Sequence, residues 1–322
     1  MEDFCMKRKK KKRGFGLILL VCILMGGAWA AANWGHSKTL AKSAWNYVTT
    51  SSSNRSFALN EIAGEAAFVM DLDSGETLFY KNENKKMYPA STTKILSALV
   101  ALEKGNPNDV ITVGDEVNLK TAGESSAGLV QGQKLKLRDL IAGMMLPSGN
   151  DAARTVSRYV ANRDKGKNIS ADEANVYFAG LMNKKAKEIG ATKSHFVNSH
   201  GLHDPEHYST VHDMALIAKE AMKNELFRNI VSKESYTTAA AKPAQTYVNR
   251  NKLLLQDNPV YYSGVNGIKT GFTDEAGYCL VSSARKNGKN LISVVFHSGR
   301  DNVWTDSQKL LDYGFDKLMV QK

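Results

Sequence analysis

The chain has 322 residues, of which 43% are hydrophobic and 23% charged, and its formal net charge is +11. These proportions are those of a globular protein that buries a core, and they exclude a chain too polar to fold. Part of the positive charge is concentrated in the basic run Lys7–Arg13. The remainder shows no basic stripe with interleaved aromatic residues, so we expect no nucleic-acid partner.

The cysteine content excludes a disulfide framework. Of Cys5, Cys22 and Cys279, the first two lie near the N-terminus, so the folded part holds a single cysteine. Cys279 lies in the apolar run Tyr278–Val281 and is expected to be a small buried hydrophobic residue. No pair of cysteines has the spacing of a zinc ribbon.

The N-terminus resembles an export signal. The basic run precedes 18 residues without a charge, Phe15–Ala32, and Ala28-Trp29-Ala30 fits a small-x-small cleavage site. The apolar segment is long for a signal peptide core and short for a membrane span, so cleavage and anchoring both stay open. We expect residues 1–34 to direct export, residues 35–58 to form a tether, and residues 59–322 to fold outside the cytoplasm.

Periodicity predicts strands at both ends of the folded part and helices between them. Turn sequences at Asp73–Glu76 and Asn287-Gly288 predict two hairpins. The expected strands are Ala66–Asp71, Thr77–Lys81, Gly267–Phe272, Tyr278–Arg285 and Asn290–His297. The expected helices are one that begins near Ser91 and ends near Lys104, then Arg138–Leu146, Asp151–Ala161, Ser170–Ile189, Thr210–Lys223 and Thr305–Met319.

This order of elements predicts an α+β fold. Because strands lie on both sides of a helical segment, we expect the early and late strands to pair in one antiparallel sheet. The sheet would be flanked by helices, with a helical subdomain inserted between its strands.

One short motif, Ser91-Thr92-Thr93-Lys94, precedes the apolar segment Ile95–Leu102, which predicts a helix buried on all sides. Residues three apart at a helix start share a face, and a hydroxyl beside an amine fits an activated nucleophile. The motif alone is weak, because about one Ser-x-x-Lys is expected by chance in a chain of this length. A second one, Ser283–Lys286, is indeed present.

Two later motifs strengthen the first. Ser148-Gly149-Asn150 is expected in a loop between helices, and Lys269-Thr270-Gly271 on a strand beside a hairpin. The ordered set of three is typical of penicillin-binding proteins and class A β-lactamases.

Longer stretches around these motifs resemble the low-molecular-mass D-alanyl-D-alanine carboxypeptidases, peptidase family S11, and the resemblance covers residues 59–315. The stretches are Pro89–Lys94, Leu146–Ala153, Asn198–Met214 and Lys269–Thr273. The resemblance implies a β-lactamase-like DD-peptidase fold, with peptidoglycan stem peptides ending in D-Ala-D-Ala as substrates and β-lactams as acylating ligands. It implies neither a cofactor nor a metal. Many members continue into a β-rich domain and an amphipathic anchor, which this sequence does not show before Lys322. We therefore expect attachment to the cytoplasmic membrane through the N-terminal segment.

The chemistry and the resemblance together suggest catalytic roles. Ser91 is expected to be the nucleophile and Lys94 its base, which requires burial and nearby positive charge to favour the neutral amine. Ser148 would relay a proton to the leaving amine, and Asn150 would hold Lys94 or the substrate amide.

The expected substrate-binding strand carries Lys269, Thr270, Gly271 and Phe272. Lys269 would supply positive charge and attract the terminal carboxylate, to which Thr270 would donate a hydrogen bond. The backbone N–H groups of Ser91 and Phe272 would form the oxyanion hole. Arg300 is either a further carboxylate ligand or a solvated surface residue.

Several alternatives stay open from the sequence. An endopeptidase of the same family would share every motif. A class A β-lactamase would need a Glu-x-x-Leu-Asn pattern, which is absent, so we expect slow release of penicillin. The histidines between His195 and His212 suggest a zinc peptidase, but no His-Glu-x-x-His is present. An inert peptide-binding module would not need both Ser91 and Lys94.

Overall fold

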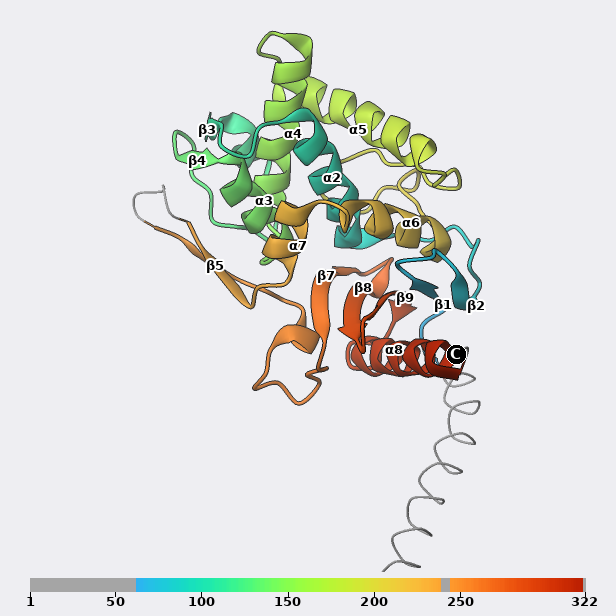
Figure 1. Ribbon diagram of the computed structural model, residues 1–322. Coiled ribbons are helices and arrows are strands. Elements are labelled where there is room, and N and C mark those ends of the chain that lie inside the picture. Colours follow the sequence, from blue (N-terminus) through green and yellow to red (C-terminus); the bar gives the residue numbers. More distant parts are fainter. Residues whose placement is uncertain (1–61, 239–243, 321–322) are drawn as a thin grey trace, which may run out of the picture. The chain divides into compact units, whose positions relative to one another are not determined.

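The computed structural model describes residues 62–238 and 244–320, shown in colour in Figure 1. The leader, the tether and the domain boundary expected near Leu59 lie outside these residues. Within them, no helix combines the length and the apolar character needed to cross a bilayer.

A five-stranded sheet in the order β2-β1-β9-β8-β7 organises the fold, and every neighbouring pair is antiparallel. Early and late parts of the chain meet in it, since Ala66 of β1 lies opposite Phe296 of β9. The strands are β1 (Ala66–Asp71), β2 (Thr77–Lys81), β7 (Val265–Thr273), β8 (Gly277–Lys286) and β9 (Lys289–Ser298). The expected α+β fold with one antiparallel sheet is therefore confirmed.

Helices cover both faces of this sheet. Successive residues of a strand point to opposite faces. Phe68 contacts His212 of α6 (Val211–Ala221) edge to face, with ring centroids 5.4 Å apart. The next residue, Val69, faces α8 (Asn302–Val320), because a methyl group on Gly314 would lie 2.9 Å from its Cγ1. Figure 1 shows the sheet between α8 and the helical segment that includes α6.

The helical segment is assembled around α2 (Lys94–Lys104). Residues 94–101 of this helix are all buried, as expected for a helix enclosed on every side. It packs against α3 (Leu137–Met145), α4 (Asn150–Lys165), α5 (Ala171–Glu188) and α6. This central position fixes the residues at the start of α2 between the helical segment and the sheet.

Side-chain caps begin three of the helices. The hydroxyls of Ser170 and Thr210 accept hydrogen bonds from the backbone N–H groups of Glu173 and Asp213, at 3.2 and 3.0 Å. Asn224 caps α7 (Glu225–Val231) in the same way. The first two caps match the predicted helix starts, whereas α7 was not predicted, because seven residues give little periodicity.

The remaining elements are short and were not predicted. Two-stranded sheets join β3 to β4 and β5 to β6. Their bounds are β3 (Val110–Thr112), β4 (Lys134–Lys136), β5 (Ser235–Thr237) and β6 (Thr246–Val248), and the 3-10 turns are η1 (Ala90–Thr93), η2 (Asp115–Leu119) and η3 (Lys252–Leu254). Strands of three residues are too short to show a clear alternation.

The structure corrects the predicted start of the helix near Ser91. The helix expected to begin near Ser91 begins at Lys94, and Ser91 lies in the preceding turn η1. Ala90 has a positive φ of 46°, and Thr92 closes the turn by donating its hydroxyl to the Pro89 carbonyl at 2.6 Å. The serine therefore sits on a tight turn rather than within a helix.

Candidate active site

Ser91 and Lys94 meet where η1 passes into α2. The Nζ of Lys94 lies 2.8 Å from the Oγ of Ser91, 2.7 Å from the Oδ1 of Asn150 and 2.6 Å from the carbonyl oxygen of His200. The Asn150 and His200 oxygens can only accept. A neutral Lys94 amine that donates its two protons to them therefore turns its lone pair towards the Ser91 hydroxyl.

The surroundings of Lys94 favour that neutral form. Its side chain is fully buried. Burial, and then the positive charge of Lys269, hold the pKa of Lys94 well below its ordinary value, and Glu124 opposes this change. Burial and the neighbouring Lys94 likewise keep the pKa of His200 well below its usual range, so its ring is neutral. Lys94 thus has the environment that a general base requires.

The edge strand β7 lies directly against the turn that carries Ser91. A methyl group on Gly271 would lie 3.1 Å from the backbone nitrogen of Ser91 and 3.1 Å from the carbonyl of Pro89. These distances are shorter than ordinary contacts of a Cβ, so glycine favours this close approach of two backbones. Strand β7 and η1 therefore form one continuous wall of the site.

Lys269 lies behind this wall rather than in the cavity. Its side chain is buried, and its Nζ donates to the carbonyl of Thr270 at 2.9 Å. Burial and the charge of Arg250 lower the pKa of Lys269 to about 7. Its effect on the site is therefore that of a nearby charge, while the residues that follow it on β7 line the cavity.

The Ser148-Gly149-Asn150 motif joins α3 to α4. Ser148 has a φ of 68°, a strained backbone conformation for a residue other than glycine. Its side chain lines the same cavity as Ser91, and Asn150 opens α4 with its Oδ1 towards Lys94. The structure thus brings the motif to Ser91, as the sequence predicted.

The segment 195–209 supplies the carbonyl of His200. Asn198 shapes it: its Oδ1 accepts from the backbone N–H of Gly201 at 2.7 Å, and its amide donates to the carbonyl of Leu202 at 3.1 Å. Gly201 has a φ of 82° and packs so closely on Ala90 that any side chain would clash. Nothing in the sequence identified this segment as part of the site, although it resembled the family.

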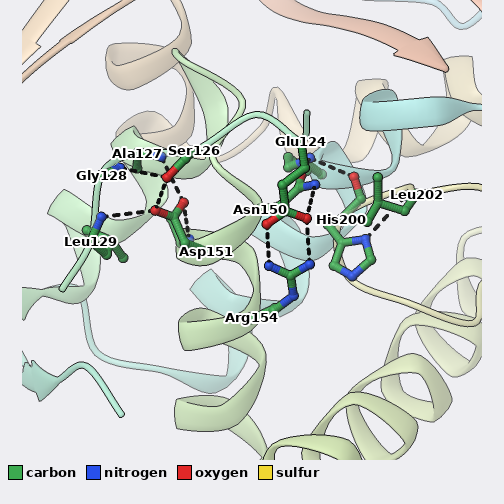
Figure 2. A network of polar contacts seen from close by, with 12 residues as sticks. Glu124, Ser126, Ala127, Gly128, Leu129, Asn150, Asp151, Arg154, His200 and Leu202 are labelled. Carbon is green, nitrogen blue, oxygen red and sulfur yellow. Dashed lines mark hydrogen bonds and ion pairs between the residues drawn. The ribbon is translucent and has the colours of Figure 1, made fainter. Parts of the chain in front are cut away.

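A third segment, residues 120–133, lies on another side of the cavity that Ser91 lines. The carboxylate of Asp151 accepts hydrogen bonds from the Ser126 hydroxyl and the backbone N–H groups of Ala127 and Leu129, at 2.6, 2.8 and 3.0 Å (Figure 2). The same segment carries Glu124, whose carboxylate contacts Asn150 and Arg154. Sequence analysis missed this segment because it has no periodicity and no motif.

These walls enclose a cavity of about 670 Å³. The predicted residues Ser91, Ser148, Asn150, Thr270, Gly271 and Phe272 line it, together with Glu124 and Arg250, which were not predicted. Arg300 does not line the cavity, and its side chain is exposed. Of the two open roles for Arg300, the solvated one fits this position.

Two histidines, His195 and His207, make contacts that stabilise segment 195–209. His207 is buried, accepts a hydrogen bond at Nδ1 from the backbone N–H of Val197, and its Nε2 lies 2.8 Å from the Oγ1 of Thr93. His195 contacts the carbonyl of Glu206. In the part of the chain that the structure describes, no three or more His, Cys, Asp or Glu side chains are grouped so as to hold a metal ion.

The chain is similar to known proteins over most of its length. A family model described as D-alanyl-D-alanine carboxypeptidase, peptidase S11, matches residues 49–299. The chain is 33% identical to D-alanyl-D-alanine carboxypeptidase DacF of Bacillus subtilis over 80% of its length, and 34% identical to the carboxypeptidase of Streptomyces sp. strain K15 over 79%. It is also 35% identical to DacC of Escherichia coli over 79%.

These relatives differ in length. The chain spans 64% of the Bacillus protein and 62% of the Escherichia protein, which is less than two thirds, but 88% of the Streptomyces protein.

Solved structures agree with the fold. The crystal structure of the Streptomyces K15 DD-transpeptidase, 33% identical, superposes with a TM-score of 0.71 over 79% of this chain and 98% of that one. Penicillin-binding protein D2 of Listeria monocytogenes in its ampicillin-bound form, 28% identical, has a TM-score of 0.65 over the same shares.

Proposed function

Because the chain belongs to the D-alanyl-D-alanine carboxypeptidase family, peptidase S11, we propose that it is a serine-type D-Ala-D-Ala carboxypeptidase. Its substrates are peptidoglycan stem peptides, and β-lactams acylate the same serine. The observation that carries this proposal is the buried Lys94 amine, which lies 2.8 Å from the Ser91 hydroxyl and within hydrogen-bond distance of two oxygens that can only accept.

The reaction follows from this arrangement. Ser91 Oγ attacks the carbonyl carbon of the penultimate D-Ala while its proton passes to Lys94 Nζ. The backbone N–H groups of Ser91 in η1 and Phe272 in β7 stabilise the oxyanion. The proton then passes from Lys94 through the Ser148 hydroxyl to the leaving D-Ala nitrogen, and the C–N bond breaks. Water hydrolyses the resulting ester and regenerates Ser91.

The far end of the substrate carries a carboxylate, and positive charge gathers where it would lie. Thr270 and Arg250 line the cavity, and Lys269, the residue of β7 before Thr270, is buried next to it. The Thr270 hydroxyl and the Arg250 guanidinium hold the carboxylate, and Lys269 adds its charge. Phe272, half-exposed and stacked on Tyr278 with centroids 4.4 Å apart, lies beside this end of the cavity.

Hydrolysis of a penicilloyl ester should be slow. A class A β-lactamase uses a glutamate to activate water. Here the carboxylate of Glu124, which lines the cavity, already accepts two hydrogen bonds from Arg154 and one from Asn150. It is therefore not free to take a proton from water, which favours a peptidase over a β-lactamase.

The proposal is tested with the purified domain and a pentapeptide ending in D-Ala-D-Ala. The unsubstituted protein should release one D-alanine per peptide and carry a long-lived penicilloyl adduct on Ser91 by mass spectrometry. Ser91→Ala should do neither. Rapid penicillin turnover would favour a β-lactamase, and absence of D-alanine release would favour the inert binding module. Muropeptide masses separate loss of D-alanine from cleavage of a cross-link, the endopeptidase outcome, and from joining of two peptides.

The site of action also belongs to this proposal. Peptidoglycan lies outside the cytoplasm, so the basic run Lys7–Arg13 and the apolar segment Phe15–Ala32 export the domain and either tether it to the membrane or are removed. The N-terminal residue of the protein recovered from cells decides between these: Met1 or Glu2 indicates an anchor, and a start near Ala31 indicates cleavage. Retention of the whole chain in the cytoplasm would contradict export.

A further inference from the structure

A buried ion pair adjoins the catalytic lysine without touching it. The Glu124 carboxylate accepts from both terminal nitrogens of Arg154, each at 2.7 Å, and its side chain is 1% exposed (Figure 2). Its Oε2 also accepts from the Nδ2 of Asn150 at 3.2 Å. Asn150 and Arg154 lie one turn apart on α4, so they present their side chains to the same carboxylate.

This contact determines which end of the Asn150 amide faces Lys94. A carboxylate can only accept hydrogen bonds, so the NH₂ group of Asn150 points to Glu124 and its Oδ1 to Lys94. With the amide reversed, two acceptors would face each other at Glu124, and the amide N–H would face an N–H of Lys94 unless the amine turned its lone pair away from Ser91. The orientation that leaves Lys94 available to Ser91 therefore depends on Glu124.

The pair also sets the charge balance around Lys94. Three cations act on the Lys94 amine from different elements: Lys269 on β7, Arg154 on α4, and Arg250 between β6 and η3. Glu124 is the anion that opposes them. The neighbouring His200 ring on segment 195–209 is neutral because burial and Lys94 lower its pKa.

We propose that Glu124 and Arg154 are a positioning pair for the reaction: together they hold the Asn150 amide with its oxygen towards Lys94 and place a paired negative and positive charge beside it. This inference rests on the proposed function, because it takes Lys94 as the base that activates Ser91. The pair acts through Asn150 and through charge, and it forms no bond to the substrate.

The test is the pH dependence of the rate of Ser91 acylation by a fluorescent penicillin, measured on the purified domain. In the unsubstituted protein the rate falls towards acid pH as Lys94 gains a proton. Glu124→Gln removes the anion, which lowers the pKa of Lys94, so this acid limb should move to lower pH by on the order of one unit. The maximal rate should also fall roughly tenfold, because a charged hydrogen bond to the Asn150 amide is lost.

Two further variants separate charge from geometry. Arg154→Lys keeps the charge but cannot form the two-pronged contact, so the acid limb should stay in place while the maximal rate falls. The double variant Glu124→Gln/Arg154→Gln removes both charges, so its acid limb should return towards that of the unsubstituted protein. If Glu124→Gln does not fold, as judged by thermal melting, these two variants still decide the question.

A matched control lies one turn further along the same helix. Arg158 contacts the buried carboxylate of Glu116 at 2.7 Å, and Glu116 also accepts from Thr155. Glu116→Gln should lower the melting temperature without moving the acid limb.

An acid limb that stays in place in Glu124→Gln, or that moves equally in Glu116→Gln, would overturn the inference. So would an unchanged maximal rate in Arg154→Lys. If the unsubstituted protein shows no acylation of Ser91 at all, the proposed function is refuted instead.

Discussion

At the scale of single residues, the site contains two buried lysines, Lys94 and Lys269. Burial and the charge of Lys269 hold the pKa of Lys94 well below its ordinary value, as the proposed base requires, and burial lowers the pKa of Lys269 to about 7. The charge of Lys269 disfavours the proton on Lys94, and that of Arg250 disfavours the proton on Lys269. Their division of roles follows from their contacts: Lys94 faces the Ser91 hydroxyl, and Lys269 faces only the backbone of Thr270.

The pKa of Lys269 predicts a pH-dependent affinity for substrate. Below about pH 7 Lys269 is charged and attracts the terminal carboxylate, and above it the charge is lost. We expect the KM for a D-Ala-D-Ala peptide to rise as the pH increases through 7 to 9. Steady-state kinetics across this pH range measure the KM. A peptide that ends in an uncharged carboxamide is the control. A KM that stays constant from pH 6 to 9, or rises equally for the carboxamide, would contradict this role.

Sequence motifs marked residues that the structure brings together. Ser91, Lys94 and Asn150 were predicted to act together, and the structure places them within hydrogen-bond distance of one another through Lys94. Glu124 was not identified, because its partner Arg154 is 30 residues away and no local pattern marks either residue. The roles of the motif residues stay predictions until the variants are measured.

At the scale of elements, strong periodicity decided what the sequence could predict. The strands of the sheet and the longer helices were predicted within a few residues, because each has a buried and an exposed side or a fully apolar run. The turn at Ser91 was mistaken for the first turn of a helix, since a positive φ at Ala90 leaves no signal in the residue type. The segments 120–133 and 195–209 are held by side-chain contacts to distant residues, which periodicity cannot reveal.

Segment 195–209 is attached to α2 at two points and to the preceding turn η1 at a third. Ser97 donates its hydroxyl to the Ser199 carbonyl at 2.6 Å, Lys94 donates to that of His200, and the Nε2–H of His207 donates to Thr93. The Nδ1 of His207 accepts from Val197, and burial lowers its pKa to about 3, so this pattern persists at all ordinary pH values. The segment therefore presents the His200 carbonyl to Lys94 in a fixed position.

This attachment predicts that His207 positions Lys94 from a distance. His207→Ala should lower both the acylation rate and the free energy of unfolding, the latter by about 1–3 kcal/mol, because the Thr93 and Val197 groups are left buried without partners. His207→Gln, which keeps a donor, should recover part of both. Penicillin acylation and urea unfolding measure these effects.

The partner residue provides the control. If the double variant Thr93→Val/His207→Ala loses no more acylation rate and no more free energy of unfolding than His207→Ala alone, the two residues act as one contact. Fully additive losses, or no rescue by glutamine, would contradict the coupling.

At the scale of the whole molecule, the buried charged groups of the site lower the stability of the fold. The sheet and α2 supply a continuous apolar core, yet Lys94, Lys269 and Arg154 are buried beside it. A lysine whose pKa is lowered on folding binds fewer protons in the folded state than in the unfolded state. For Lys269 this cost to stability is full below about pH 7, and it disappears as the pH rises towards the ordinary lysine value of 10.5.

Replacing this lysine should therefore trade activity for stability. Lys269→Met fills a similar volume without a charge, so we expect a higher melting temperature at pH 7 by several degrees, together with a large loss of Ser91 acylation. The gain should shrink between pH 7 and 10, because the unsubstituted protein is relieved of the same cost as its unfolded state loses the proton. Calorimetry at several pH values measures the melting temperature of both proteins.

The control is Lys185→Met, which removes a lysine paired with Glu103 on the surface of the helical segment. This variant should show no such pH-dependent gain. A melting temperature lowered by Lys269→Met at every pH would show that the ammonium group stabilises the fold, and the proposed conflict between site and core would then be wrong.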